Sequence, residues 1–260
     1  MSRDLLFLAG TGDARELAVR IGAKGYTVLA TVVTDSAAKS LAEAGIDTRV
    51  GRLAAAEMSD LIASTGIAAV VDASHPFAEE ASRNAIAAAE AASVPYIRYE
   101  RGSRSYHDHP NVTIVDDYAG AAELAAQRRG VIMLTTGSKT LSVFTERLLG
   151  VPDTRLIARM LPRLDNMEKC EALGVEQKNI VAMQGPFSKE LNKALFQQFG
   201  VTLMITKESG KEGAVDDKLE AALEMGIDTI MIGRPAVDYG TQFSGFDEVI
   251  AQIERMIGRR

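Results

Sequence analysis

Residues 5–15 read Leu5-Leu6-Phe7-Leu8-Ala9-Gly10-Thr11-Gly12-Asp13-Ala14-Arg15, in which an apolar run passes through two glycines into a polar segment. The apolar residues 5–9 predict a buried strand, and residues 13–24 predict a helix. A strand that turns through glycines directly into a helix is typical of a parallel sheet with helices on its faces. This stretch therefore decides the fold class, and the rest of the chain repeats its alternation.

Short β-branched runs alternate with alanine-rich segments along almost the whole chain. Further strands are predicted at residues 27–33, 48–50, 68–72, 96–98, 131–135, 156–160, 180–183, 202–206 and 229–232. Further helices are predicted at residues 37–44, 54–64, 78–92, 141–149, 167–173, 189–199, 214–225 and 246–257. The pattern predicts an α/β protein with two doubly wound, Rossmann-like parallel-sheet domains and a cleft between them.

Residues 102–111 break the alternation with Gly, Ser, Asp, Pro and two histidines. We therefore predict a dinucleotide-binding domain at residues 1–101, a linker with a connecting helix at 102–128, and a substrate domain at 129–260. Residues 70–77 and 180–187 both predict a strand, a turn, a Pro-Phe pair and a helix. This similarity is either the trace of two related halves or a coincidence, because proline is common in first helical turns.

The composition excludes several classes of protein. The 260 residues are 47% hydrophobic, which is ample for a core and excludes general disorder. The net charge of -6 argues against nucleic acid and membrane surfaces as partners. The single cysteine, Cys170, excludes an internal disulfide, and neither a secretory pattern nor an apolar run of membrane-spanning length is present. A cytoplasmic location is expected.

The glycine turn of the opening stretch is a candidate phosphate site. Gly10, Thr11, Gly12, Asp13, Ala14 and Arg15 link a strand to a helix, where backbone N–H groups can receive the pyrophosphate of a dinucleotide. The alternative is a simple strand-to-helix turn, since Arg15 replaces the small residue of the usual fingerprint. Asp35 follows the second strand and either accepts from an adenosine ribose, which favours NADH over NADPH, or caps a helix.

Polar residues also follow the fourth strand, in Asp72-Ala73-Ser74-His75-Pro76-Phe77. The carboxyl ends of parallel strands form the ligand crevice of such folds. Ser74 and His75 are therefore candidate cofactor contacts. His75 is alternatively a helix cap or an acid/base group, because histidine exchanges a proton near neutral pH.

Three polar loops follow strands of the second half: Thr135-Thr136-Gly137-Ser138-Lys139, Gln184-Gly185-Pro186-Phe187-Ser188 and Thr206-Lys207-Glu208-Ser209-Gly210-Lys211. Each alone is an ordinary turn with a solvated lysine. Together they converge on one edge of the sheet and suit an anionic ligand.

Other sites are disfavoured by their patterns. The chain has no Walker motif, no Gly-x-Ser-x-Gly elbow and no Tyr-x-x-x-Lys pair. His107-Asp108-His109 lacks a cysteine nearby and lies in a predicted loop, so we predict no metal site. Arg98, Arg101 and Arg104 are predicted to supply positive charge near the hinge.

Five segments together resemble the precorrin-6A and cobalt-precorrin-6A reductases, in their order and in their spacing along nearly the whole chain. They are the glycine turn with Glu16-Leu17, residues 72–78, and the loops at 135–139, 184–188 and 206–210. The sequence departs from that family at Ser138, where an arginine is usual, and at Lys211, where a glycine is expected. The resemblance implies reduction of one double bond of a tetrapyrrole-derived macrocycle by NADPH or NADH, during corrin ring synthesis.

The expected site residues follow from the motifs and from this resemblance. Cofactor binding is expected of Gly10, Thr11, Gly12, Asp13, Ala14, Arg15, Asp35, Ser74, His75, Thr136 and Gly137, with His75 as the candidate catalytic residue. Macrocycle binding is expected of Ser138, Lys139, Gly185, Pro186, Phe187, Lys207, Ser209, Gly210 and Lys211. Two other functions stay open, a non-catalytic nucleotide sensor and a different oxidoreductase, as do a monomeric and a homodimeric state.

Overall fold

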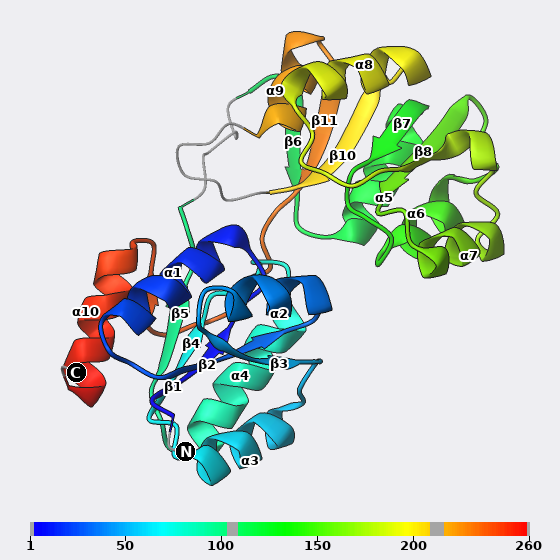
Figure 1. Ribbon diagram of the computed structural model, residues 1–260. Helices are drawn as coiled ribbons and strands as arrows, with labels where there is room; N and C mark the ends of the chain where they lie inside the picture. The colour runs from blue at the N-terminus through cyan, green and yellow to red at the C-terminus, as the bar shows by residue number, and fades with distance from the viewer. Residues whose placement is uncertain (1–2, 103–108, 209–215, 259–260) are drawn as a thin grey trace. The chain divides into compact units, whose positions relative to one another are not determined.

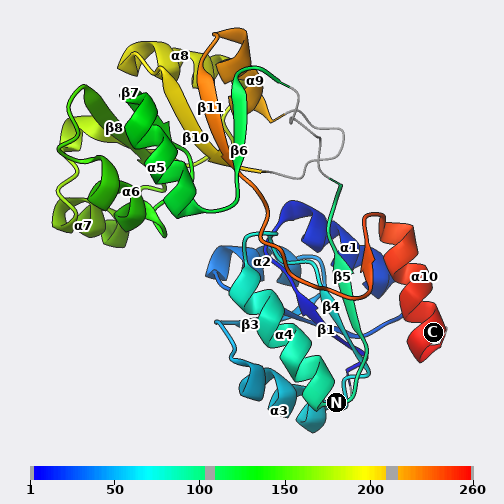
Figure 2. The same ribbon diagram turned by 180° about the vertical axis from the view of Figure 1, so that it is seen from behind.

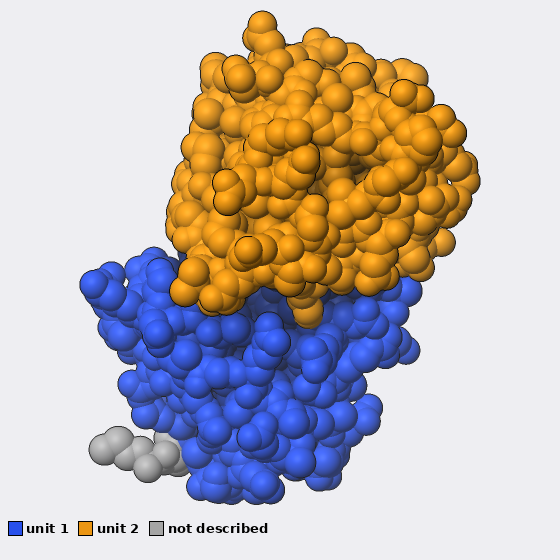
Figure 3. All heavy atoms as spheres, turned by 90° about the vertical axis from the view of Figure 1, so that its right-hand side faces the viewer, with its two compact units in different colours: residues 1–102, 235–260 blue, residues 103–234 orange. Residues whose placement is uncertain are grey.

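The computed structural model describes residues 3–102, 109–208 and 216–258, which form two parallel six-stranded sheets flanked by helices (Figures 1 and 2). The chain divides into two compact units, one of Met1–Gly102 with Pro235–Arg260 and the other of Ser103–Arg234 (Figure 3). The predicted α/β class with two parallel sheets is confirmed.

The first unit has the strand order β12-β5-β4-β1-β2-β3, with every neighbouring pair parallel. Its strands are β1 (Leu5–Leu8), β2 (Val28–Val32), β3 (Asp47–Val50), β4 (Ala69–Asp72), β5 (Tyr96–Tyr99) and β12 (Gln242–Phe243). Its helices are α1 (Gly12–Ala23), α2 (Asp35–Ala42), α3 (Ala55–Thr65), α4 (Glu79–Ala91) and α10 (Phe246–Ile257). The chain reverses its direction of travel across the sheet between β1 and β4, which makes this the switch point.

The second unit has the strand order β6-β11-β10-β7-β8-β9, again with every pair parallel. Its strands are β6 (Val112–Val115), β7 (Gly130–Leu134), β8 (Thr154–Met160), β9 (Ile180–Ala182), β10 (Leu203–Lys207) and β11 (Asp228–Ile232). Its helices are α5 (Tyr118–Arg128), α6 (Leu141–Leu148), α7 (Leu164–Ala172), α8 (Lys189–Phe199), α9 (Asp217–Glu224) and the short 3-10 helix η1 (Gln177–Asn179). Its switch point lies between β7 and β10.

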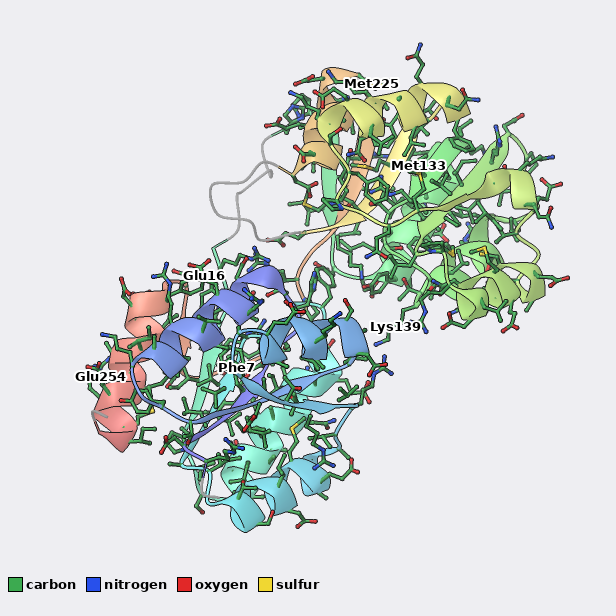
Figure 4. The ribbon with its side chains drawn as sticks, in the orientation of Figure 1. Phe7, Glu16, Met133, Lys139, Met225 and Glu254 are labelled. Atoms are coloured by element: carbon green, nitrogen blue, oxygen red, sulfur yellow. The ribbon has the colours of Figure 1, made fainter. Side chains whose placement is uncertain are left out.

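The central strand β1 is buried on both faces, as its unbroken apolar sequence predicts. Leu5 and Phe7 pack in one core with Leu17 of α1, whereas Leu6 and Leu8 pack in a second core with residues of α3 and α4. Figure 4 shows Phe7 of β1 within the first unit and Met133 of β7 within the second. Packing on both faces fixes the position of β1, and the position of its carboxyl end determines where the following glycine turn lies.

The first segment of the first unit ends at Gly102, one residue beyond the predicted boundary at 101, but the structure has no boundary at the predicted position 128. The segment predicted as a linker with a connecting helix contributes β6 and α5, and β6 pairs with β11 in the second sheet. The last 26 residues, 235–260, return to the first unit. The physical reason is that the apolar face of α10, with Val249, Ile250 and Ile253, is buried in the core of the first sheet.

The two Pro-Phe stretches occupy different places in the two sheets. The first follows β4, which lies beside the central strand β1, whereas the second follows β9 at the edge of the second sheet. The position equivalent to β4 is held by β10. The strand order thus repeats between the units, but these two stretches are not equivalent, and their similarity is a coincidence.

Candidate functional site

The turn between β1 and α1 forms an open cradle at the switch point of the first sheet. The hydroxyl of Thr11 accepts from the backbone N–H of Ala14 at 3.2 Å, so that α1 begins at Gly12. A Cβ atom added to Gly10 or Gly12 would meet no protein atom within 4 Å. Internal packing therefore does not require these glycines. Because glycine has no side chain, a ligand can approach the backbone N–H groups at the start of α1. Such N–H groups fit the pyrophosphate of a dinucleotide.

The charged residues of this turn are engaged within the first unit. Asp13 forms an ion pair with Arg101, and Arg15 donates from Nε to the carbonyl of Ser40 at 3.1 Å. Ala14 is fully buried. Two of the predicted cofactor contacts thus have a structural place within the first unit. Arg15 links α1 to α2, and Ala14 belongs to the core. The pairing of Asp13 was not predicted, and it offsets a negative charge at the place proposed for a phosphate.

Asp35 is the first residue of α2 and is exposed. The prediction that it caps this helix is wrong, because Thr34 is the cap and accepts from the N–H of Ala37 at 3.3 Å. Val33 beside it is 60% exposed, and Val50 at the end of the neighbouring β3 is 47% exposed. A free-standing carboxylate next to apolar surface is a setting that suits an adenosine group.

His75 lies after β4, the other strand of the switch point, and its side chain is exposed. Its Nδ1 accepts from the backbone N–H of Phe77 at 3.2 Å. The cap position of α4 is Ala78, so the bond of His75 is made within the preceding turn. A neutral imidazole that accepts at Nδ1 carries its proton on Nε2. His75 is therefore oriented to donate a hydrogen bond from Nε2.

A buried charge cluster, formed by Asp72, Tyr96, Arg98 and Glu100, supports this loop. Arg98 is fully buried, with Nη1 at 3.0 Å from Asp72 Oδ1 and Nη2 at 2.7 Å from Glu100 Oε2. The prediction that Arg98 supplies positive charge near the hinge is wrong, because two carboxylates neutralise it. Burial by itself lowers the pKa of Arg98, but Asp72 and Glu100 raise it overall. Burial and the adjacent Asp72 also raise the pKa of Tyr96.

The cluster reaches the candidate cofactor contacts through Ser74. The backbone N–H of Ser74 donates to Asp72 Oδ1 at 2.9 Å, and its hydroxyl accepts from Arg98 Nη1 at 3.3 Å. Tyr239 covers the cluster, with its ring centroid 4.8 Å from the guanidinium carbon of Arg98. Sequence reasoning missed the cluster because only the pairing of β4 with β5 brings Asp72 level with Arg98.

The second unit presents a loop, residues 135–139, at its own switch point. Gly137 has a φ of +79° with open space around it. Thr136 is 5% exposed, and its Oγ1 is buried without a hydrogen-bond partner in the structure as described. Ser138 donates to Asn166 Oδ1 at 2.5 Å, and the exposed Lys139 is labelled in Figure 4. The loop thus combines a left-handed backbone conformation that favours glycine with a buried hydroxyl that has no partner among the described residues.

Lys207 ends β10, the other strand of this switch point. Burial lowers its pKa, and the positive charges of Lys139 and Lys218 lower it further. The structure therefore brings the predicted residues Lys139 and Lys207 into electrostatic contact. Like charges in proximity repel each other and favour an anion between them. The other predicted residues of this loop, Ser209, Gly210 and Lys211, lie outside the described residues.

The third polar loop leaves β9 and leads into α8. Phe187 covers the guanidinium of Arg159 on β8, with 4.4 Å between its ring centroid and the guanidinium carbon. Gly185 and Pro186 precede it, and a Cβ on Gly185 would lie 3.1 Å from the Phe187 ring. Arg159 was not predicted. The available signal was a charged residue inside the apolar strand Leu156-Ile157-Ala158-Arg159-Met160.

Of the candidate metal and hinge residues, Arg104, His107 and Asp108 lie outside the described residues. Among residues 3–102, 109–208 and 216–258, no three His, Cys, Asp or Glu side chains cluster as a metal site. In the same ranges, no helix combines the length and apolar character that a membrane span requires.

The family model "Precorrin-6x reductase CbiJ/CobK" matches residues 4–254 of the chain. The chain belongs to this family. The resemblance drawn from the motifs is thus confirmed, and with it an oxidoreductase of the precorrin-6x reductase type. The findings do not favour a nucleotide sensor or an oxidoreductase of another kind.

Individual members of the precorrin-6x reductase family match along almost their full length. A protein of Priestia megaterium named cobalt-precorrin-6A reductase is 61% identical over 246 residues, which are 95% of this chain and 96% of that protein. A Methanocaldococcus jannaschii protein of the same name is 35% identical over 255 residues, which are 97% and 99% of the two chains. The solved structure "CobK precorrin-6A reductase" superposes with a TM-score of 0.81 at 26% identity and covers 99% of this chain and 98% of its own.

The buried cluster allows a stability prediction. Replacing Arg98 by Met leaves Asp72 and Glu100 buried without their cation, so we expect the free energy of unfolding to fall by about 3–5 kcal/mol. Urea unfolding measures this change. The control is Arg83→Ala, which removes an exposed pair with Glu79 and is expected to cost less than about 1 kcal/mol. Equal costs for the two variants would contradict a supporting role of the cluster.

Proposed function

We propose that this member of the precorrin-6x reductase family reduces cobalt-precorrin-6A with NADH. The cobalt form of the substrate is supported by the curated relatives at 61% and 35% identity, which are named for it, whereas relatives at 29% and 28% identity are named precorrin-6A reductases. The structural observation that carries the reductase assignment is the bare cradle at Gly10 and Gly12, where a dinucleotide can approach the backbone.

In this proposal, most of the cofactor contacts belong to the first unit. Gly10, Thr11 and Gly12 receive its pyrophosphate at the start of α1, and Asp35 accepts hydrogen bonds from the adenosine ribose. His75 donates from Nε2 to the cofactor. When bound, the nicotinamide supplies the hydride, and the protein supplies orientation. The exposed Asp35 carboxylate repels a 2′-phosphate, so it supports NADH as the cofactor rather than NADPH.

The second unit holds the macrocycle. Its substrate class carries several carboxylate side chains, which Lys139 and Lys207 can bind by charge-assisted hydrogen bonds. Burial and the positive charges of Lys139 and Lys218 lower the pKa of Lys207, and a substrate carboxylate nearby would favour its charged form. Ser138, Gly185, Pro186 and Phe187 stay proposed contacts on the same edge of the sheet. Thr136 and Gly137 stay proposed cofactor contacts.

The loss of NADH absorbance on addition of cobalt-precorrin-6A tests the reaction. We expect turnover with this macrocycle and none with simple carbonyl compounds. The variant Gly12→Val serves as the control, because a Cβ at this position meets no protein atom within 4 Å and the added side chain is expected to block the pyrophosphate. Unchanged NADH affinity in Gly12→Val would place the phosphate site elsewhere, and absence of turnover in the wild type would refute the proposed reaction.

The cofactor preference is tested by Asp35→Asn. Removal of the carboxylate is expected to raise kcat/KM for NADPH relative to NADH about tenfold or more, because a charge repulsion of more than about 1.4 kcal/mol disappears. Glu43→Gln makes the same charge change at the opposite end of α2 and is expected to leave the ratio unchanged. An unchanged ratio in Asp35→Asn shows that Asp35 does not contact the ribose.

The role of His75 is tested by steady-state kinetics of His75→Ala and His75→Gln. If Nε2 binds the cofactor, His75→Ala raises KM for NADH more than it lowers kcat. Glutamine keeps an N–H donor, so His75→Gln is expected to recover part of the lost affinity. A loss confined to kcat in both variants would instead assign His75 to proton delivery, because an amide cannot replace an acid.

A further inference from the structure

The two units each contain a buried arginine near the carboxyl end of a strand, but the two differ in their partners. Arg98 is 0% exposed and faces the carboxylates of Asp72 and Glu100. Arg159 is 8% exposed, and no carboxylate among the described residues lies within ion-pair distance of it. A buried charge without a partner is unfavourable, and proteins normally pair it. Arg159 is therefore an exception that requires an explanation.

Among the described residues, the charged groups near Arg159 do not neutralise it. Asp216 attracts it, but the carboxylate of Asp216 already pairs with Lys218 at 2.7 Å. Burial outweighs this attraction and lowers the pKa of Arg159 to about 10. Lys207 on β10, two strands away, is also positive. With a pKa of about 10, Arg159 stays cationic at neutral pH.

The guanidinium is nevertheless held firmly. Its Nη1 donates to Asn192 Oδ1 at 2.7 Å, and Asn192 is itself 1% exposed and donates to the carbonyl of Ser188 at 2.8 Å. Phe187 covers the guanidinium on one side. Arg159 makes no other hydrogen bond to the described residues. Donors that are fixed in direction and lack acceptors form a preorganised receptor, and the planar guanidinium matches a carboxylate in particular.

The position of Arg159 agrees with a ligand site. Ala158 pairs with Leu134, so Arg159 lies level with the start of the loop at residues 135–139. The residues that follow β8 and β9, Leu161 and Met183, are 45% and 38% exposed. They place apolar surface at the edge where the cation lies. Apolar surface beside a fixed cation fits a flat ring system that carries carboxylates.

We propose that Arg159 binds a carboxylate side chain of the macrocyclic substrate and thereby acts as a specificity-determining residue. The proposal rests on the proposed function, which it extends by adding a third cation to Lys139 and Lys207. Asn192 and Phe187 are positioning residues in this arrangement, since they touch the guanidinium and fix its plane.

The test compares Arg159→Gln with a matched control, Arg155→Gln. Arg155 lies on the same face of β8, donates to Asn179 Oδ1 at 2.8 Å and stacks on Phe199 at 5.7 Å, but it lies at the amino end of the strand. We expect Arg159→Gln to raise KM for cobalt-precorrin-6A about tenfold to a hundredfold, with KM for NADH unchanged. Arg155→Gln is expected to leave both KM values unchanged.

Thermal unfolding separates a binding role from a structural one. A cation without a carboxylate partner gives little stability, so we expect the Tm of Arg159→Gln to stay close to that of Arg155→Gln. Wild-type macrocycle affinity in Arg159→Gln overturns the proposal, as does an equal rise of both KM values together with a lower Tm. If Arg159→Gln does not fold, Arg159→Lys decides: it keeps the charge but loses the planar fork, and a wild-type KM for the macrocycle overturns the proposal.

Equilibrium dialysis of cobalt-precorrin-6A without NADH distinguishes a failure of the proposed reaction from a failure of the role proposed for Arg159. If the wild type binds the macrocycle but does not reduce it, the proposed reaction fails while the role of Arg159 is still measured by the dissociation constant. A dissociation constant in Arg159→Gln that is about tenfold or more above the wild-type value supports the carboxylate contact. Equal dissociation constants, or no binding by the wild type, overturn it.

Discussion

The burial of two central strands on both faces is the constraint on which the rest of the structure depends. β1 and β7 lie at the middle of their sheets, and each is paired with a parallel neighbour on either side. Because all pairs are parallel, every carboxyl end lies at one edge of its sheet, and the reversal of strand order leaves space at that edge. The loops at residues 9–11 and 135–139 therefore occupy equivalent places in the two units.

The two units treat charge at these edges in opposite ways. In the first unit, Arg98 is neutralised by two carboxylates and Asp13 is paired with Arg101, which leaves backbone N–H groups and the glycine cradle as the recognition surface. In the second unit, burial lowers the pKa of Lys207 and of Arg159, and no carboxylate among the described residues forms an ion pair with Arg159. Backbone groups suit a pyrophosphate, and uncompensated side-chain cations suit a ligand with several carboxylates.

This contrast also explains where the stability of the chain is reduced for function. Burial of a guanidinium is more costly without an anionic partner than with one, whereas the Asp72-Arg98-Glu100 cluster ties β4 to β5. Retention of unfavourable groups at binding sites is a common trade between stability and activity. The unsatisfied hydroxyl of Thr136 at the same edge is a second instance in the second unit.

The sequence alone determined the local units and the family. The apolar run of β1, its glycine turn and its helix were readable because burial on both faces leaves a continuous apolar pattern, and the motifs in their order identified the precorrin-6x reductases. Only the tertiary structure decided which sheet receives β6, β12 and α10, because strand pairing and helix docking join segments that lie far apart in the chain. For the same reason it alone distinguished Arg98, which pairs with two carboxylates, from Arg159, which pairs with none among the described residues. The partners of a buried charge are set by register and packing rather than by neighbours in sequence.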